Sequence, residues 1–596
     1  MANTKEEASL FLMQSTLGAN YALINKVATD GIDSWLDTQL MHTVTSDDTF
    51  HNRTNEIWKD FKQQAIDTAP GETGTGNIIG TGNATLPYNF YWRMGWWHRT
   101  LSKDNTNASG NTAITTVKEK NDENLVRHRV AQALSEILVI SDKSVLELDG
   151  VGMASFYDIL YKGAFGTYAD MLKKVSLHPM MGVFLTHLNN KKESGDQHPD
   201  ENYAREIMQL FTIGLNELNN DGTEKKDADG KSIPTYNNDD IKQLAKVFTG
   251  LKGAKYNYEW PDAITGFNVI QNKAIDLKTV TNKTHITIPY IDMVNPMIEE
   301  SAYHDTTTKT LLNGKVNIAM NGNLTADINK AVDDLVKHQN TAPFIAKKLI
   351  QQLVTSNPSA SYVSAVASKF GTTGDLKAVI KEILTHTEAK ASTAKKLKSP
   401  LLRVTQILRA FNVKNTSGKF WFRGDMVDMK LQHHVLSSPT VFNFYLPNYA
   451  PHGDIETANQ VAPEFQLHNS ATSIGYANMM YDLLFTSDNK LDITVPTKIH
   501  STEFFRTSDT TLADDKLAFD FTAEKALITD TTTGAGIDDL IKRISLVLTG
   551  TETCSIKDEI KDTLTAKIGY TNLDWVVQTV VFLIVSSPSF TVQMKR

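Results

Sequence analysis

The chain has 596 residues, of which 41% are hydrophobic and 21% charged, and its formal net charge is −8. These fractions are typical of a globular protein and exclude a disordered, fibrous or membrane-embedded chain. The acidic balance excludes a nucleic-acid-binding protein, because such a protein needs a basic face to neutralise phosphates. A single cysteine, Cys554, excludes an internal disulfide and a cysteine-based metal cluster.

No membrane-spanning segment is expected. The most apolar stretch covers residues 575–585 and still contains Gln578 and Thr579. It is far shorter than the ~20 residues that a helix needs to cross a bilayer. The N-terminal sequence MANTKEEASL has neither the basic nor the apolar region of a signal peptide, so the chain as given is expected to carry none.

The first 250 residues are predicted to be helical, because apolar residues recur at helical spacing between polar breaks. Gly18, Gly214 and Gly250 each follow such a stretch, where a glycine commonly ends a helix. A further helix opens at Tyr91 with a cluster of tryptophans. The other expected helices cover residues 8–17, 22–28, 32–40, 47–66, 123–140, 152–161, 168–175, 179–188, 201–213 and 239–249.

The pattern changes between residues 251 and 292, where HITIPYIDM alternates and predicts a small β element. Helices return at residues 326–338, 343–353, 359–370, 375–386, 400–411, 537–548 and 573–586. The predicted fold is mainly α, a large multi-helix body with a small β insertion and long irregular loops. Three parts are expected: helical residues 1–250, a β or irregular insertion at 251–320, and helical residues 321–596, which pack with the first part into one body.

The segment HPDENYAREIMQLFTIG, residues 198–214, combines an apolar helical face with a polar flank. At 3.6 residues per turn, four polar residues share that flank: Asn202, Arg205, Glu206 and Gln209. Glu201 is expected on the far side of the helix. Three interpretations stay open for the flank: a solvated surface, a buried structural network and a ligand site.

Arg205 favours the last two interpretations. The chain has 60 basic residues, few of them arginine, and Arg205 is the only arginine between residues 130 and 402. Arginine presents a planar fork of donors that lysine lacks. An isolated arginine in a lysine-rich stretch therefore indicates that bidentate geometry is needed there.

A second candidate segment is YHDTTTKTLLNG, residues 303–314. His304 and Asp305 supply an acid–base pair, and Lys309 adds a cation. Adjacent histidine and aspartate side chains bind a metal or hold an imidazole in one tautomer. The alternative is a turn in which Asp305 caps the residues that follow.

A third candidate segment covers residues 431–454, where three prolines stiffen an aromatic-rich loop. Asn443, Tyr445 and His452 on this loop suit the binding of a sugar or a peptide. The alternative is that the loop fills the core between helices. The motifs GxSxG, HExxH, the P-loop and the dinucleotide-binding GxGxxG before a helix are all absent.

Several long motifs resemble the bacterial family named domain of unknown function 1800. They include RHRVAQALSEILVIS, DENYAREIMQLFTIGL, HDTTTKTLLNG, PTVFNFYLPNYAPHG and VAPEFQLHN. The resemblance covers nearly the whole chain and implies a mostly helical, exported protein with a periplasmic or extracellular location. It also implies a sulfatase-like partner, from domain-of-unknown-function family 1501, and a surface polymer. The chain departs from the family at Asp200, Gln209 and Thr307, and the change at Gln209 would put an activity in doubt.

Two functions follow as hypotheses. The first is a non-enzymatic envelope protein that binds a surface polysaccharide or a partner protein through Asn202, Asn443, Tyr445 and His452. The second is a metal-assisted hydrolase or polymer-modifying enzyme with catalytic residues Glu201, Arg205, Glu206, His304, Asp305 and Lys309. In that enzyme a divalent metal bound by His198, His304 and Asp305 would activate water. One geometric expectation separates the two hypotheses: a shared site requires that His304 lies near Glu206 or Asn202, with Asn443 beside them. If these side chains lie apart, the envelope-protein hypothesis is the better account.

Overall fold

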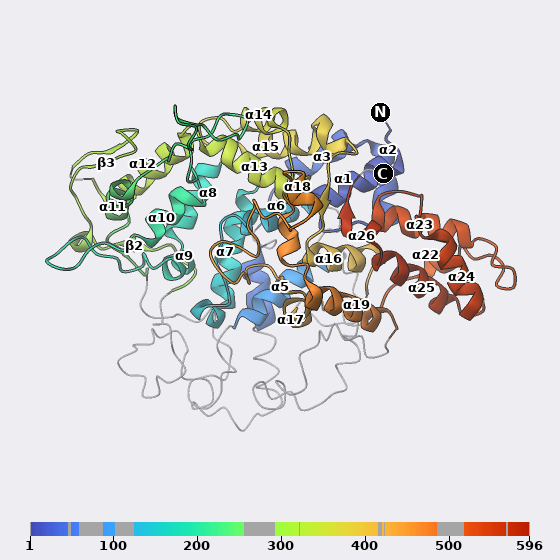
Figure 1. The fold of residues 1–596 in the computed structure, drawn as a ribbon. Helices are drawn as coiled ribbons and strands as arrows, with labels where there is room; N and C mark the ends of the chain where they lie inside the picture. The colour runs from blue at the N-terminus through green and yellow to red at the C-terminus, as the bar shows by residue number, and fades with distance from the viewer. Residues whose placement is uncertain are drawn as a thin grey trace, which may run out of the picture.

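The structure of the protein is a computed structural model. It describes residues 2–45, 49–58, 88–101, 124–254, 292–320, 322–414, 420–421, 424–485, 518–567 and 570–594. Over these residues the protein is mainly helical, with small two-stranded sheets (Figure 1). The predicted fold class is confirmed.

The N-terminal helices follow the predicted stripes closely. Their bounds are α1 (Lys5–Ser15), α2 (Tyr21–Asp30), α3 (Ile32–Met41), α5 (Asn89–Leu101), α6 (Leu125–Ser135), α7 (Gly150–Gly163), α8 (Tyr168–Leu177), α9 (Pro179–Phe184), α10 (Asn202–Gln209) and α11 (Asn238–Val247). A further helical stretch covers residues 50–58, and the rest of the helix expected to reach residue 66 lies outside the described residues.

The C-terminal helices include several that the apolar pattern did not predict, among them α17, α19 and α24. The bounds are α12 (Leu324–Lys337), α13 (Thr341–Leu353), α14 (Ala360–Ala367), α15 (Leu376–Thr385), α16 (Pro400–Ala410), α17 (Asp425–Leu431), α18 (Asp454–Thr457), α19 (Ser470–Phe485), α22 (Thr522–Lys525), α23 (Ile537–Thr549), α24 (Lys557–Lys567), α25 (Leu573–Val585) and α26 (Pro588–Thr591).

The strands form short antiparallel pairs. β1 (Leu251–Lys252) pairs with β2 (Ile298–Glu299), β3 (Lys309–Leu311) with β4 (Val316–Ile318), and β5 (Lys396–Leu397) with β6 (Val592–Gln593). Most of the β element predicted at 251–292 lies outside the described residues, which resume at residue 292. The β3–β4 hairpin places the 303–314 segment against α11 and α12.

One hydrophobic core runs from Ala8 to Phe590 and joins the two ends of the chain. The Ser9 hydroxyl of α1 donates to the carbonyl of Leu546 on α23 at 2.8 Å. Figure 1 shows the two termini close together, and α11 and α12 at the opposite end of the molecule from α22–α25. Among the described helices, none is long and apolar enough to cross a membrane.

The helix predicted at residues 201–213 is shorter than expected. α10 ends at Gln209, because the N–H groups of Ile213 and Gly214 both donate to the carbonyl of Met208 and close a wide turn. Gly214 then adopts a left-handed φ of 71°. α11 matches its prediction better, since Asn237 and Asp240 form a capping box at its start.

Gly250 provides a test of how tightly α11 is joined to the 303–314 segment. Its φ is +83°, and an added Cβ would lie 2.8 Å from the backbone nitrogen of His304. We expect Gly250→Ala to lower the free energy of unfolding by about 3 kcal/mol, because the left-handed backbone and the contact both cost energy. The control is Gly230→Ala: its φ is +77° with nothing within 4 Å of the added Cβ, so about 1 kcal/mol should be lost. Equal losses in denaturant unfolding would show that the contact has no role.

Candidate functional site

α10 packs its apolar face into the core as the sequence predicts. Tyr203 and Ile207 are fully buried, and the Tyr203 ring stacks on His187 with centroids 4.0 Å apart. The Tyr203 hydroxyl also forms a 2.6 Å hydrogen bond with the hydroxyl of Ser176. These contacts fix the rotation of the helix, so its polar side is turned away from the core.

Arg205 lies at the surface, not in a buried network. Its side chain is 41% exposed, and its Nη2 lies 3.3 Å from Oε2 of Glu201. The expectation that Glu201 lies on the far side is wrong, because residues four apart share one side of a helix. Asn202 is also close to solvent, and its amide donates to the Thr186 hydroxyl at 3.4 Å. The buried-network interpretation of Arg205 is therefore wrong.

Glu206 differs from the other polar residues on this side of α10, such as Arg205, because it is only 5% exposed. Its Oε2 is buried and has no hydrogen-bond partner among the described residues. Burial raises the pKa of the Glu206 carboxyl, and the nearby cations Arg205 and Lys348 oppose that rise. A buried acceptor without a donor is costly in a purely structural position.

Lys348 of α13 completes the environment of Glu206. Its amine donates to the carbonyl of Leu210 at 3.0 Å and lies 4.4 Å from the centre of the Phe344 ring. Burial lowers the pKa of Lys348 to about 8, although Glu206 opposes the shift. Sequence analysis missed this residue, because the pair of lysines at 347–348 looks like an ordinary solvated helix face.

Tyr236, just before α11, lies beside the polar side chains of α10. Its hydroxyl donates to Oε1 of Gln209 at 3.2 Å, and burial raises its pKa. We call this group the α10 flank. It consists of Glu201, Arg205, Glu206, Gln209, Tyr236 and Lys348.

His304 forms a separate buried cluster. Its Nδ1 lies 2.8 Å from the carbonyl oxygen of Thr249, and its Nε2 lies 3.2 Å from Oδ2 of Asp327 on α12. Lys309 is fully buried, and its amine donates to the same Asp327 oxygen at 2.7 Å. Both ring nitrogens are occupied by acceptors, so the ring ties the end of α11 to α12. We call His304, Lys309 and Asp327 the His304 cluster.

Asp305 supports a turn, as the alternative interpretation stated. Its Oδ1 accepts hydrogen bonds from both the backbone N–H and the hydroxyl of Thr307. Burial alone would raise the pKa of the Asp305 carboxyl, but these bonds and the charge of Lys309 outweigh it and the pKa is lowered. The carboxylate is thus occupied locally.

The predicted metal site is not assembled. His198 is 71% exposed and its Nδ1 lies 3.3 Å from Glu193, whereas His304 is buried in its own cluster. In the part of the chain that the structure describes, no three His, Cys, Asp or Glu side chains gather as metal ligands. The proposed ligand set His198, His304 and Asp305 therefore has no common centre here.

The aromatic loop is anchored on Glu136, which follows α6. The Tyr445 hydroxyl donates to Oε2 of Glu136 at 2.7 Å, and the Asn443 amide donates to the same oxygen at 3.3 Å. His433 lies 3.2 Å from the other oxygen. Burial would raise the pKa of Glu136, but the hydrogen bonds of His433 and Tyr445 outweigh it and hold the pKa at about 2. The loop thus fills the core at Asn443 and Tyr445, as the alternative stated.

The predicted residues therefore divide among several places and do not share one cleft. Asn443 and Tyr445 contact Glu136, His304 contacts Asp327, and His452 is 96% exposed beside Glu456 at 2.9 Å. Within the described residues, the hydrogen bonds of His304 include none to Glu206, Asn202 or Asn443. The expected convergence is not supported, because these side chains bind different parts of the chain: Tyr445 contacts Glu136, and His304 contacts Asp327.

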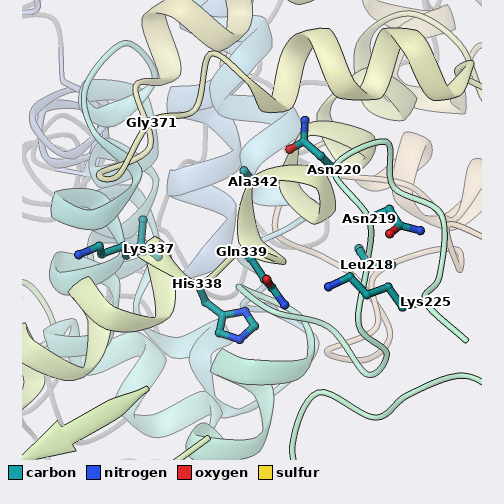
Figure 2. Close-up of a pocket in the computed structure, with 10 residues that line it drawn as sticks. Leu218, Asn219, Asn220, Lys225, Lys337, His338, Gln339, Ala342 and Gly371 are labelled. Atoms are coloured by element: carbon teal, nitrogen blue, oxygen red, sulfur yellow. The ribbon is translucent and has the colours of Figure 1, made fainter. Parts of the chain in front are cut away.

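A surface pocket of ≈ 400 Å³ lies between the segment of residues 218–225 and the turn that joins α12 to α13. Figure 2 shows His338, Gln339 and Lys225 among its lining side chains. Burial lowers the pKa of His338 to about 4, and Lys315, whose amine lies 3.2 Å from its Nε2, acts in the same direction. Sequence analysis missed this pocket, since no motif marks either of its walls.

A family model described as a protein of unknown function, DUF1800, matches residues 10–592. The chain belongs to this family. The match includes α6, α10, the His304 cluster and the aromatic loop, so one family pattern spans all the groups described above. Neither the curated proteins nor the solved structures gave a match.

The low pKa of Glu136 predicts a pH-dependent stability. The unfolded carboxyl takes up a proton near its ordinary pKa of 4.5, but the folded one does so only near 2. The stabilisation is therefore complete above about pH 4.5 and is lost as the pH falls towards 2, by about 3 kcal/mol. Glu136→Gln should be less stable at pH 7 and should lack this part of the acid dependence.

Denaturant unfolding at a series of pH values measures the effect. Glu559→Gln, on the exposed face of α24, controls for the loss of one carboxylate. If Glu136→Gln and the wild-type chain lose the same free energy of unfolding between pH 4.5 and 2, the ionised Glu136 carboxylate does not stabilise the fold as predicted.

Proposed function

We propose that the chain is a non-enzymatic binding protein of the cell envelope or exterior that holds a hydroxyl-rich surface polymer on the α10 flank. The observation that carries the proposal is the buried Oε2 of Glu206, which lacks a donor among the described residues. A ligand hydroxyl would supply that donor. Because Oε2 is buried, the side chains that cover it would have to move aside when the ligand binds, and the proposal needs no metal.

The rest of the α10 flank supplies complementary groups. Arg205 is 41% exposed, and among the described residues its one ion pair is the 3.3 Å contact with Glu201. Its guanidinium can therefore turn to a ligand oxygen at little cost. Gln209 and Tyr236 add an amide and a phenol, which both donate and accept. The hydroxyls of a polysaccharide also donate and accept hydrogen bonds. Polar side chains beside an aromatic ring therefore suit such a ligand.

The envelope setting and the partner rest on the family resemblance. It implies export to the periplasm or the exterior, and a sulfatase-like partner of family 1501 acting on the same polymer. The aromatic loop is a less suitable polymer site, because Glu136 occupies Asn443 and Tyr445 inside the protein. His452 remains available at the surface, where it lies beside Glu456.

A metal-free acid–base enzyme is the second candidate, and one observation favours it. Burial lowers the pKa of Lys348 to about 8 and raises that of Glu206, so both groups shift towards neutrality. Such opposed shifts are common where protons are transferred. The binding role is preferred because the Lys348 amine already has a structural acceptor, the carbonyl of Leu210.

Affinity electrophoresis tests the proposal, with polysaccharides of neutral and acidic type cast in the gel. We expect the wild-type chain to be retarded, and Glu206→Gln to weaken the apparent affinity about tenfold, which corresponds to one lost hydrogen bond to a charged group. Glu559→Gln on α24 removes a carboxylate of equal charge at a distant exposed position and should leave retardation unchanged.

Two outcomes contradict the binding role. One is equal mobility of the wild type in all the gels, and the other is unchanged retardation of Glu206→Gln. Release of new reducing ends by the wild type, with a rate that rises towards pH 8 and is lost in Lys348→Met, would instead support the second candidate.

A further inference from the structure

The surface pocket beside the turn that joins α12 to α13 is large enough for a small molecule. Its volume is ≈ 400 Å³, and ligand sites in proteins usually measure about 300–1,000 Å³. Residues 218–225 form one wall and residues 336–342 the other (Figure 2). Asn340 ties these walls together, because its Oδ1 accepts from the N–H of Leu218 at 3.0 Å and its amide donates to the carbonyl of Asn216 at 2.8 Å. The pocket is therefore held in shape by the fold.

His338 lines this pocket and carries a proton that has no acceptor among the described residues. The backbone N–H of Asn340 donates to its Nδ1 at 3.2 Å, so Nδ1 is unprotonated and the neutral ring carries its proton on Nε2. Burial and the charge of Lys315 lower the pKa of His338 to about 4, which agrees with a neutral ring. The amine of Lys315 lies 3.2 Å from Nε2. A lysine ammonium only donates, so two donors face each other.

Lysines around this histidine outnumber the carboxylates. Lys225 and Lys337 line the pocket, and Lys315 lies beside His338. Lys225 pairs with Glu217 at 3.3 Å, whereas neither Lys315 nor Lys337 has an ion pair within the described part of the chain. The pocket also reaches the first turn of α13, where a helix favours negative charge. An anionic group that accepts from both facing donors would relieve their conflict.

The rest of the lining suits a hydroxylated ring. Asn219, Asn220 and Gln339 provide three amides, and Leu218 and Val336 provide apolar surface. The amides of Asn219 and Asn220 donate to side-chain hydroxyls of the protein at 3.0 and 3.1 Å, so their oxygens remain as acceptors for a ligand. An inorganic ion would occupy only a small part of the volume and would not contact these groups.

We propose that this pocket binds a hexuronate, a sugar ring that carries one carboxylate. The carboxylate lies between His338 and Lys315 and accepts one hydrogen bond from Nε2 and one from the amine. The ring hydroxyls donate to the amide oxygens, and the C–H groups of the ring contact the apolar wall. The site shares no residue with the α10 flank, so it does not depend on the polymer-binding proposal.

Isothermal titration calorimetry of the full chain tests the ligand class. The probes are the methyl glycosides of glucuronate and galacturonate, the matching neutral glycosides of glucose and galactose, and inorganic phosphate. We expect a uronate to bind at least about tenfold more tightly than its neutral counterpart, because only the carboxylate can accept from both donors. Phosphate should bind more weakly than that uronate, because it leaves the amides without a contact.

Two variants remove the two donors separately. Lys315→Met, at an exposed position, should weaken the uronate about fivefold. His338→Asn should weaken it similarly, because asparagine can still accept from the N–H of Asn340 but lacks the Nε2 donor. The matched control is Lys430→Met, at an exposed position on α17, which lies apart from α12 and α13 in Figure 1. Neither this control nor Glu206→Gln on the α10 flank should change the uronate affinity.

Four results would overturn the proposal. The first is that neither uronate binds the wild type, and the second is that each uronate binds no more tightly than its neutral counterpart. The third is phosphate binding as tight as that of the better uronate, which would indicate a site for inorganic anions. The fourth is an unchanged uronate affinity in Lys315→Met and His338→Asn, which would place the ligand elsewhere. If His338→Asn does not fold, Lys315→Met decides the fourth result.

Discussion

The buried carboxylate of Glu136 is the constraint on which the middle of this protein depends. It follows α6 directly, and its donors come from Gln132 one turn earlier and from residues 433–445 much later in the chain. A charged group in the interior is tolerated only when hydrogen bonds replace its hydration. The chain therefore has to bring the aromatic loop back to α6, and the loop cannot be displayed as a free binding surface.

Much of the fold could be predicted from the sequence because it depends on local periodicity. The stripes of α1–α3, α7, α8 and α12–α16 are long and regular, and the structure confirms them. α10 was extended too far, since its apolar residues continue into a turn that a helical pattern cannot distinguish from a helix. α19 was missed because Ser470–Phe485 is apolar on most sides, and a moderately apolar segment gives no clear stripe.

The candidate site could be predicted only in part, for a related reason. Periodicity along one helix correctly grouped Arg205, Glu206 and Gln209, and it placed Tyr203 in the core. Nothing local marked Lys348 or Tyr236, which reach the α10 flank from other elements. The isolation of Arg205 was misleading, since its side chain is 41% exposed, whereas Arg129 in α6 is fully buried only two residues from another arginine. Burial of a charge is set by tertiary contacts that spacing does not encode.

The central claim is that Glu206 is left open for a ligand while Glu136 and His304 are occupied by the protein. The most direct measurement is a crystal structure of the full chain soaked with a fragment of the polysaccharide that retards it. The account predicts a ligand hydroxyl within hydrogen-bond distance of Oε2 of Glu206, with Glu136 still bound by Tyr445 and Asn443. A fragment bound elsewhere, with Oε2 of Glu206 paired to a donor of the protein itself, would contradict it.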